Sequence, residues 1–501
     1  MFVEQGPQNL KFGGGVSDSV LNPGVLAVVV VVGILLWIWP RNKAVAAFLA
    51  AGLLIPMDQV LVLGGMHFPM IRVLVIFGFV RILKDKLSSK APLFSGGWNK
   101  LDLVVVLLTV VTALNGILLF REFGAVVNQL GNLYTVFGIY FLLRFLIRDQ
   151  DDVIRAFRTL AYIACAVAVI MSFEFFTGHN PYAMLGGAQA WIYSALAARG
   201  DRFRAQAAFG HSILAGTFGA VLVPLFVALW WKDRKSRKLA VFAIVACTII
   251  TVACNSSTPI LAYAGGVFAL FLWPIRRSMR FVRRGLVLLV IALHIVMKGP
   301  VWSLIEKIDL TGGSSSWHRY QLIDQCIRHF GDWWLLGVKD TSVWGWDMWD
   351  TANQYVAICD NSGLLPFILF ISVLVYGFKF LGRARRVAER PTEKDRRSAF
   401  FLWAMGAALF ANVIAYIGIS YWDQNMVSWY CLLATISAVT VVRPKKEASL
   451  IPVAVAGPDE DLMVQLAGAG ELAKHGADVR ADLPADVQRS RGLNTLYERI
   501  P

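Results

Sequence analysis

The run LDLVVVLLTVVTALNGILLF, residues 101–120, has one acidic side chain near its start and no basic one. A helix of about 20 apolar residues is long enough to cross the roughly 30 Å hydrocarbon layer of a membrane. Similar apolar blocks cover approximately residues 24–40, 44–63, 69–83, 101–120, 126–147, 153–176, 207–231, 239–253, 259–273, 285–297, 363–378, 399–419 and 426–442. The pattern predicts an all-α, polytopic integral membrane protein with about thirteen transmembrane helices.

The composition excludes an ordinary soluble protein. Of 501 residues, 57% are hydrophobic and 16% are charged, whereas soluble domains are roughly 45–50% apolar. The net charge of +15 comes from short basic runs between the apolar blocks, and no continuous basic face is evident. We therefore predict that the protein binds no nucleic acid and that lipids are its immediate partners.

The basic runs predict the orientation in the membrane. They fall on alternate sides of the blocks, as expected when one set of connections stays in the cytoplasm. The runs are residues 41–43, 81–90, 144–158, 232–238, 276–284, 379–397 and 443–446. The amino-terminus and the loops of residues 177–206 and 298–362 are then predicted to lie outside the cytoplasm. The first apolar block lacks a preceding basic region, which favours a retained anchor over a cleaved signal.

This orientation divides the chain into three predicted segments. They are residues 1–23, an extracytoplasmic segment; 24–443, a membrane domain with a large helical loop at about 298–362; and 444–501, a cytoplasmic tail with little fixed structure. The long loop is rich in tryptophan, which favours a position at the membrane interface. It also contains Cys326 and Cys359, so a disulfide between them is one option in an oxidising compartment.

Few ionisable residues fall inside the apolar blocks. The main ones are Asp58, Arg72, Glu174 and His294. A proton-coupled transporter usually needs an acid or a base near the membrane midplane, so their scarcity disfavours a transporter. Snorkelling to the interface or helix pairing is the plainer interpretation of these residues.

Arginines on the predicted outer face run against the positive-inside trend. Arg199, Arg202 and Arg204 precede an apolar block, and Arg319 lies in the long loop. A guanidinium group binds phosphate through two parallel hydrogen bonds, and the common large phosphorylated substrates outside the cytoplasm are lipid-linked. For any single arginine, a lipid head group or a surface ion pair is the plainer alternative.

The sequence lacks the usual signatures of metal and serine chemistry. It contains no HExxH, no paired CxxC, no DxD in an outer loop and no GxSxG. We therefore predict no metal and no cofactor, so that a transferase of this type would have to neutralise its leaving group with arginine.

Five short motifs follow one another between residues 204 and 365. They are RAQAAFGHSILA (204–215), WHR (317–319), WLLG (334–337), TANQY (351–355) and DNSGLL (360–365). Their order, with a long loop between late helices, resembles the O-antigen ligase and polymerase superfamily. The resemblance covers roughly residues 144–419 and includes the order of the helices.

The resemblance implies a glycosyltransferase of the bacterial inner membrane, active in lipopolysaccharide O-antigen or exopolysaccharide biosynthesis. In that family, a glycan on undecaprenyl diphosphate is transferred at the periplasmic face, without a metal, to a glycan or lipid A–core acceptor. Arg204 and Arg319 would bind the diphosphate and stabilise its developing charge. With His318, they form the predicted catalytic set. The predicted substrate contacts are Arg202, His211, Asn353, Tyr355 and Arg72.

One position departs from the ligase pattern. Ligases of the family usually carry a histidine directly before the asparagine of the TANQY region, and this chain has Ala352 there. A positioned base typically contributes a hundredfold or more in rate, and His318, Asp347, Asp350 and His211 are the available replacements. This departure weakens the strict ligase assignment more than the family assignment, and it leaves a polymerase or an exopolysaccharide relative open. The alternatives outside this class are a transporter or flippase of lipid-linked glycan and a non-catalytic subunit of an export complex.

Overall fold

The computed structural model describes residues 19–88, 92–187, 194, 198–199, 201–307, 316–389 and 393–440. The chain divides into two units, Met1–Val442 and Arg443–Pro501, and every described residue belongs to the first. The predicted cytoplasmic tail and most of the predicted amino-terminal segment lie outside the described residues.

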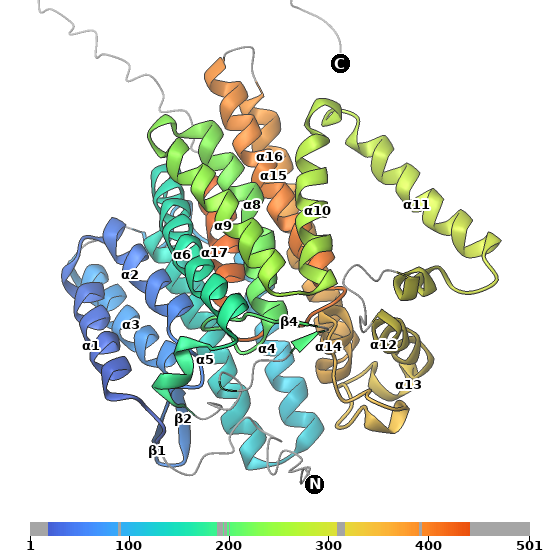
Figure 1. The fold of residues 1–501 in the computed structure, drawn as a ribbon, viewed down its shortest axis with the longest axis horizontal. Coiled ribbons are helices and arrows are strands. Elements are labelled where there is room, and N and C mark those ends of the chain that lie inside the picture. Colours follow the sequence, from blue (N-terminus) through green and yellow to red (C-terminus); the bar gives the residue numbers. More distant parts are fainter. Residues whose placement is uncertain are drawn as a thin grey trace, which may run out of the picture. The chain divides into compact units, whose positions relative to one another are not determined.

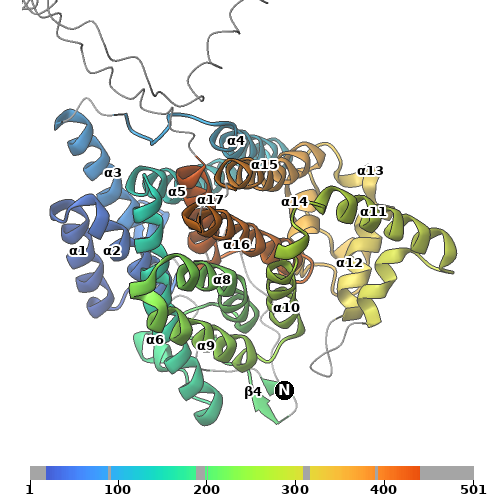
Figure 2. The ribbon, with the colours of Figure 1, turned by 90° about the horizontal axis from the view of Figure 1, so that it is seen from above.

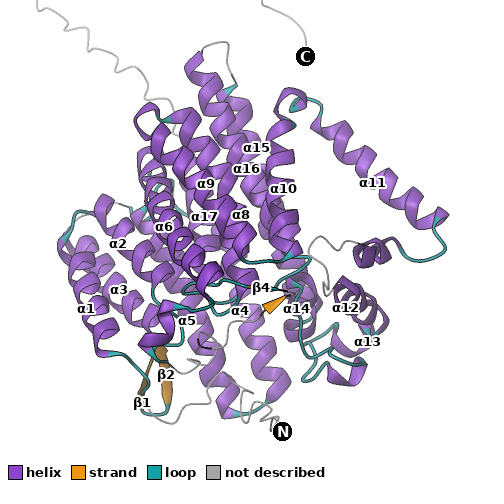
Figure 3. Cartoon of the chain, viewed as in Figure 1, coloured by secondary structure: helices purple, strands orange, loops and turns teal. Residues whose placement is uncertain are grey.

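Helices dominate the described part of the chain (Figures 1 and 3). They are α1 (Pro23–Ile38), α2 (Arg41–Leu54), α3 (Met70–Ser88), α4 (Lys100–Phe120), α5 (Phe123–Leu146), α6 (Gln150–Thr177), α8 (Ser212–Lys232), α9 (Arg237–Ala253), α10 (Ser257–Phe271), α11 (Met279–Val296), α12 (Ser316–Arg328), α13 (Phe330–Trp333), α14 (Gln354–Ser362), α15 (Leu364–Ala388), α16 (Glu393–Ala415) and α17 (Gln424–Val439). Two short antiparallel hairpins pair β1 (Val60–Leu63) with β2 (Met66–Pro69) and β3 (Ala198–Arg199) with β4 (Arg202–Phe203).

The helical fold predicted from the sequence is confirmed, and each predicted apolar block contains a helix. Seven helices in the described residues are long and apolar enough to cross a membrane. These are α4, α5, α6, α8, α9 with its preceding turn, α15 and α16. An eighth is added if α11 and the 3-10 helix Val301–Lys307, which meet at 88°, form one broken span. The larger number of thirteen crossings stays a prediction.

The block at residues 44–63 differs from the expectation of one span. Helix α2 ends at Leu54 because Ile55 precedes a proline and adopts an extended conformation, as residues before proline prefer. The rest of the block forms the β1 strand. Gly64, with a φ of +57°, then supplies the left-handed turn conformation that joins β1 to β2.

Helix α8 lies inside the bundle, packed against α6, α9, α10 and α16 (Figure 2). It is apolar on all sides, which is the pattern of a helix surrounded by other helices. Gly219 allows a close approach to α9, because a Cβ at that position would lie 2.7 Å from the Ile250 side chain. The helix therefore places its amino-terminal end, with the RAQAAFGHSILA motif, against its neighbours.

The basic segments come together at one end of the bundle, through contacts with one another. Arg41 binds the Asp152 carboxylate at 2.5 Å, and Arg276 binds Glu389 at 2.7 Å. Arg158 likewise pairs with Asp233. These contacts join the connections α1–α2 with α5–α6, α10–α11 with α15–α16, and α6 with α8–α9. We call this the basic end, and the opposite end, which holds the motifs, the motif end.

The described part of the long loop contains short helices joined by irregular segments. It contains the 3-10 helix Val301–Lys307 and helices α12, α13 and α14, which share a small core around Leu322, Trp333 and Met348. Cys326 and Cys359 are buried in this core as free thiols, with the two side chains in hydrogen-bond contact.

Candidate functional site

The connection between α16 and α17, residues 416–423, is where segments distant in sequence meet. From the TANQY motif, the Asn353 Nδ2 donates a hydrogen bond to the Ile417 carbonyl oxygen at 3.0 Å. The amide of Gln354 donates to the Tyr416 carbonyl oxygen at 2.8 Å. We call residues 416–423 the central connection.

Arg319 reaches the central connection from the first turn of α12. Its side chain is buried, with 6% exposed, and its Nε lies beside Gly418: a Cβ built on that glycine would be 3.0 Å from the Nε. Thr258, in the first turn of α10, is the other neighbour, and its Oγ1 donates to the Gly418 carbonyl oxygen at 3.5 Å. The missing side chain at Gly418 therefore makes room for the guanidinium group.

The segment that carries Arg204 is fixed by buried polar side chains. The Glu174 carboxylate, at the end of α6, accepts hydrogen bonds from the amides of Gln206 at 2.7 Å and Ala207 at 2.9 Å. Asn180 Nδ2 donates to the Ala207 carbonyl oxygen at 2.9 Å. These contacts hold Ala207 at a φ of +51°, a left-handed conformation that costs a non-glycine residue roughly 1 kcal/mol.

Two further contacts bring this segment to the other motifs. The amide of Ala205 donates to the carbonyl oxygen of Ala253, at the end of α9, at 3.1 Å. The amide of Gly210 donates to the Asp423 carboxylate at 2.5 Å. Both arginine-bearing segments thus pack around the α9–α10 turn and the central connection. That the two guanidinium groups share one cavity stays a prediction.

His318 and the acidic residues proposed as bases form one group beside Arg319. The Nε2 of His318 is 2.8 Å from the Asp347 carbonyl oxygen; because a carbonyl only accepts, this nitrogen carries the proton. Burial raises the pKa of the Asp350 carboxyl, as does nearby Asp347, whereas the neighbouring His318 and Arg319 side chains lower it. Among the acidic residues proposed as bases, Asp350 is therefore the one whose pKa is shifted by all three of these neighbours.

Several predicted substrate contacts have positioning roles in the fold. His211 caps α8, its Nδ1 accepting from the Ile213 amide at 3.1 Å. Asn353 caps α14, its Oδ1 accepting from the amides of Tyr355 and Val356. The Tyr355 hydroxyl donates to the Val413 carbonyl oxygen at 2.9 Å. Contact of these residues with a substrate stays a prediction.

The glycines of the WLLG and DNSGLL motifs let two backbone segments touch. Gly337 has a φ of +97°, and a Cβ there would lie 2.4 Å from the Asp360 carbonyl oxygen. Gly363, with a φ of +86°, faces the Leu335 carbonyl oxygen in the same way. Asn115 of α4 donates to the Ser362 carbonyl oxygen at 2.6 Å. These two motifs therefore close the long loop onto the bundle.

The structure brings neither of the two remaining predicted residues into contact with Arg319. Arg202 is exposed on β4. Arg72 joins α3 to α5: its Nε donates to Thr135 Oγ1 at 2.9 Å and its Nη1 to the His67 carbonyl oxygen at 2.7 Å. Figures 1 and 2 both place α3 and α12 on opposite sides of the bundle. The structure thus does not bring Arg72 to Arg319.

Sequence reasoning missed Thr258, Gly418 and Asp423. Burial raises the pKa of Asp423 to about 7; the hydrogen bond from Gly210 opposes this shift, and the nearby Asp58 carboxyl adds to it. The only signal in the sequence was a polar pair, WDQN at residues 422–425 and NSST at residues 255–258, interrupting apolar stretches.

The fold and the site together define a multi-helix protein with apolar helices suited to a membrane and a cluster of polar, conformationally strained segments at one end. Within the described residues, no group of three or more His, Cys, Asp or Glu side chains is placed to hold a metal ion. A comparison with models of known protein families and with curated proteins finds no match to this chain.

Proposed function

We propose that the chain is a membrane glycosyltransferase of the O-antigen ligase or polymerase type. It takes a glycan from an undecaprenyl-diphosphate-linked donor at the periplasmic face of a bacterial inner membrane. The acceptor is lipid A–core or a second glycan, in the synthesis of O-antigen or exopolysaccharide. The motif end faces the periplasm, since the basic end obeys the positive-inside rule.

One observation carries the proposal. The segments of Arg204, Arg319 and Asn353 are far apart in the sequence and meet around the central connection. Arg319 is buried at this place, with 6% of its surface exposed. A buried cation beside a cluster of motif residues is what a diphosphate leaving group requires.

In the proposed reaction, the acceptor hydroxyl oxygen forms a bond to the anomeric carbon of the donor sugar. The bond between that carbon and the phosphate oxygen breaks, and undecaprenyl diphosphate leaves with the electron pair. Arg319 and Arg204 stabilise the charge that develops on the diphosphate.

The proton of the acceptor hydroxyl passes to a base, and we assign this role to Asp350. The Nε2 of His318 is bonded to the Asp347 carbonyl oxygen, so this histidine is better suited to hold the loop than to turn toward a substrate. Partial burial raises the pKa of the Asp350 carboxyl, which brings it nearer to the value a general base needs.

The test of the proposal separates charge from shape at Arg319. Arg319→Lys keeps the positive charge and loses the planar fork. Loss of one transition-state contact is worth about 3 kcal/mol, or roughly a hundredfold in rate. Glycan transfer or chain extension is measured in cells with matched membrane levels of each variant. Arg204→Lys is expected to behave similarly.

The control is Lys307→Ala, a basic residue of the same loop outside the motifs. If cells with Arg319→Lys made nearly as much glycan as the wild type, the proposed bidentate contact of Arg319 with the diphosphate would be contradicted. An equal loss from Lys307→Ala would instead indicate general loop electrostatics.

A further inference from the structure

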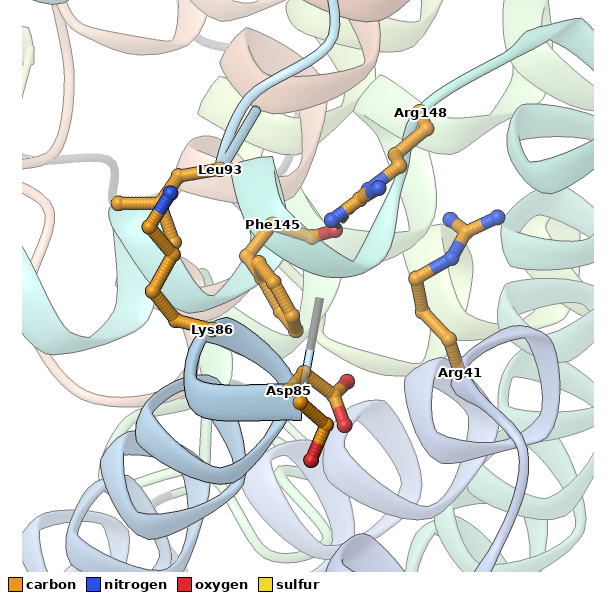
Figure 4. Close-up of a pocket in the computed structure, with 7 residues that line it drawn as sticks. Arg41, Asp85, Lys86, Leu93, Phe145 and Arg148 are labelled. Carbon is orange, nitrogen blue, oxygen red and sulfur yellow. Dashed lines mark hydrogen bonds between the residues drawn. The ribbon is translucent and has the colours of Figure 1, made fainter. Parts of the chain in front are cut away.

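A second polar feature lies at the basic end, remote from the motifs. There, α2, α3 and the end of α5 surround a cavity of about 270 Å³. Its lining includes Arg41, Lys86, Arg148, Asp85, Phe145 and Leu93 (Figure 4). None of these residues takes part in the proposed glycosyl transfer, so the cavity calls for its own account.

The charge of the lining favours an anionic ligand. Arg41, Lys86 and Arg148 contribute three positive charges, and Asp85 one negative charge, which leaves a net charge of +2. The Asp85 carboxylate also has a cation of its own outside the lining, Arg81 Nε at 3.3 Å. Asp152, also outside the lining, pairs with both Arg41 and Arg155, so a surplus of positive charge remains for an anion in the cavity.

The two arginines are held in place before any ligand arrives. Arg41 donates through its Nη1 to the Leu146 carbonyl oxygen at 2.6 Å and to Asp152 at 2.5 Å. Arg148 donates through its Nε to the Phe145 carbonyl oxygen at 3.3 Å and lies over the Phe145 ring at 5.0 Å. Both guanidinium groups lie on the same side of the cavity in Figure 4. Such preorganisation lowers the entropic cost of binding.

The closeness of the two cations has an electrostatic consequence. Burial lowers the pKa of Arg148, and the nearby charge of Arg41 lowers it further, whereas the carboxylates of Asp85 and Asp152 raise it in part. An anion placed between them replaces this repulsion by two attractions. Guanidinium groups bind phosphate oxygens in a bidentate manner.

We propose that this cavity binds the phosphate of an anionic glycerophospholipid in the leaflet at the basic end. Basic pockets between transmembrane helices on the cytoplasmic side are the usual sites for such head groups. The volume of about 270 Å³ lies just below the usual range of about 300–1,000 Å³ for ligand sites, which suits a head group whose chains stay in the bilayer. Next to Lys86 on α3, Leu87 is 80% exposed and is placed to contact an acyl chain.

The experiment uses the full chain, delipidated in detergent micelles, and measures the thermal unfolding midpoint together with bound lipid by native mass spectrometry. Phosphatidylglycerol is expected to raise the midpoint by a few degrees through preferential binding to the folded state. Phosphatidylcholine, whose choline cation meets the positive lining, is expected to leave it nearly unchanged. Inorganic phosphate at the same concentration tests whether a soluble anion suffices.

Two variants assign the effect to this cavity. Arg148→Gln is expected to weaken phosphatidylglycerol binding about tenfold, because a charge-assisted hydrogen bond is lost. Lys86→Gln, at an exposed position, is expected to weaken it about threefold without risk to folding. Lys43→Gln is the control, since Lys43 is an exposed cation of α2 outside the lining.

Equal stabilisation by phosphatidylcholine would overturn the recognition of an anionic head group. If inorganic phosphate raised the unfolding midpoint as much as phosphatidylglycerol does, the ligand would be a soluble anion and the proposal of a lipid would be wrong. Unchanged phosphatidylglycerol binding in both Arg148→Gln and Lys86→Gln would overturn the site. Glycan transfer is not measured, so the result is independent of the proposed function.

Discussion

The two ends of the bundle use their polar groups in different ways. At the basic end, carboxylates bind arginine side chains: Asp152 binds Arg41, and Asp233 binds Arg158. At the motif end, the carboxylates that hold the segment around Arg204 bind backbone amides: Glu174 accepts from the amide of Gln206, and Asp423 accepts from Gly210 in the same way. Side-chain pairs near a surface are adaptable, whereas backbone contacts fix the path of the chain.

Backbone strain is distributed in the same unequal way. Among the described residues, the non-glycine positions with positive φ are Arg121, Ala207, Asn255, Asp347 and Asp423. All of them lie in connections at the motif end. Strained conformations persist where the surroundings over-determine them, and they concentrate at functional sites. The motif end is therefore expected to be sensitive to shape, and the basic end to tolerate substitution.

The largest expected difference comes from removing one carboxylate at each end. Glu174→Ala leaves the buried amides of Gln206 and Ala207 without their acceptor, which is expected to lower the free energy of unfolding by about 3 kcal/mol. Asp233→Ala, at the other end, breaks a partly exposed pair with Arg158 and is expected to cost about 1 kcal/mol. Thermal unfolding in detergent measures both. Equal losses of stability in the two variants would contradict the proposed difference between the motif end and the basic end.

A pair of glycines tests the packing at the central connection. In Gly418→Ala, the new methyl group would lie 2.1 Å from Thr258 Oγ1, so we expect a loss of about 1–3 kcal/mol in stability and displacement of Arg319. Gly382→Ala is the matched control in α15, where a Cβ meets nothing within 4 Å, and it is expected to stabilise slightly. Retention of full stability and activity by Gly418→Ala would show that Arg319 does not depend on this space.

The pH dependence of stability tests the burial of Asp423. Because its pKa is about 7 in the folded state and ordinarily 3.8, the folded protein holds a proton that the unfolded chain releases between these values. This contribution to stability is present at low pH and is lost as pH rises toward 7. Asp423→Asn removes this titrating group. The variant is therefore expected to lose about 1 kcal/mol less stability than the wild type as the pH rises between the two pKa values, after allowance for the partial exposure of the side chain. The exposed Asp332→Asn serves as the control, and an unchanged pH profile in Asp423→Asn would argue against a buried acid.

The smallest expected effect is a gain at Ala207. Its φ of +51° suits glycine better than alanine. Ala207→Gly is therefore expected to raise the free energy of unfolding by about 0.5–1 kcal/mol, because the relief of strain outweighs the added entropy of the unfolded chain. Thermal unfolding measures the gain. A clear loss of stability would mean that the methyl group of Ala207 packs more tightly than the strain costs.

The sequence was sufficient for the positions of the helices and for the grouping of the basic segments. Both depend on local composition, since a run of about 20 apolar residues without a proline favours a helix long enough to cross a membrane. The helix ends were harder: the apolar run at 44–63 continues past Pro56, and only the backbone reveals the turn into β1. Arg319 was identified from the sequence because arginine outside the basic runs is unusual.

What the sequence by itself determined is therefore the mostly helical fold, the apolar helices long enough to cross a membrane and the unusual arginines. Only the tertiary structure decided which of these residues meet. It brought Arg319 beside Gly418 and Thr258, tied Asn353 to Ile417 and left Arg72 on the far side of the bundle. The physical reason is that hydropathy is a property of each segment, whereas a site arises from contacts between segments, and those depend on how the helices pack.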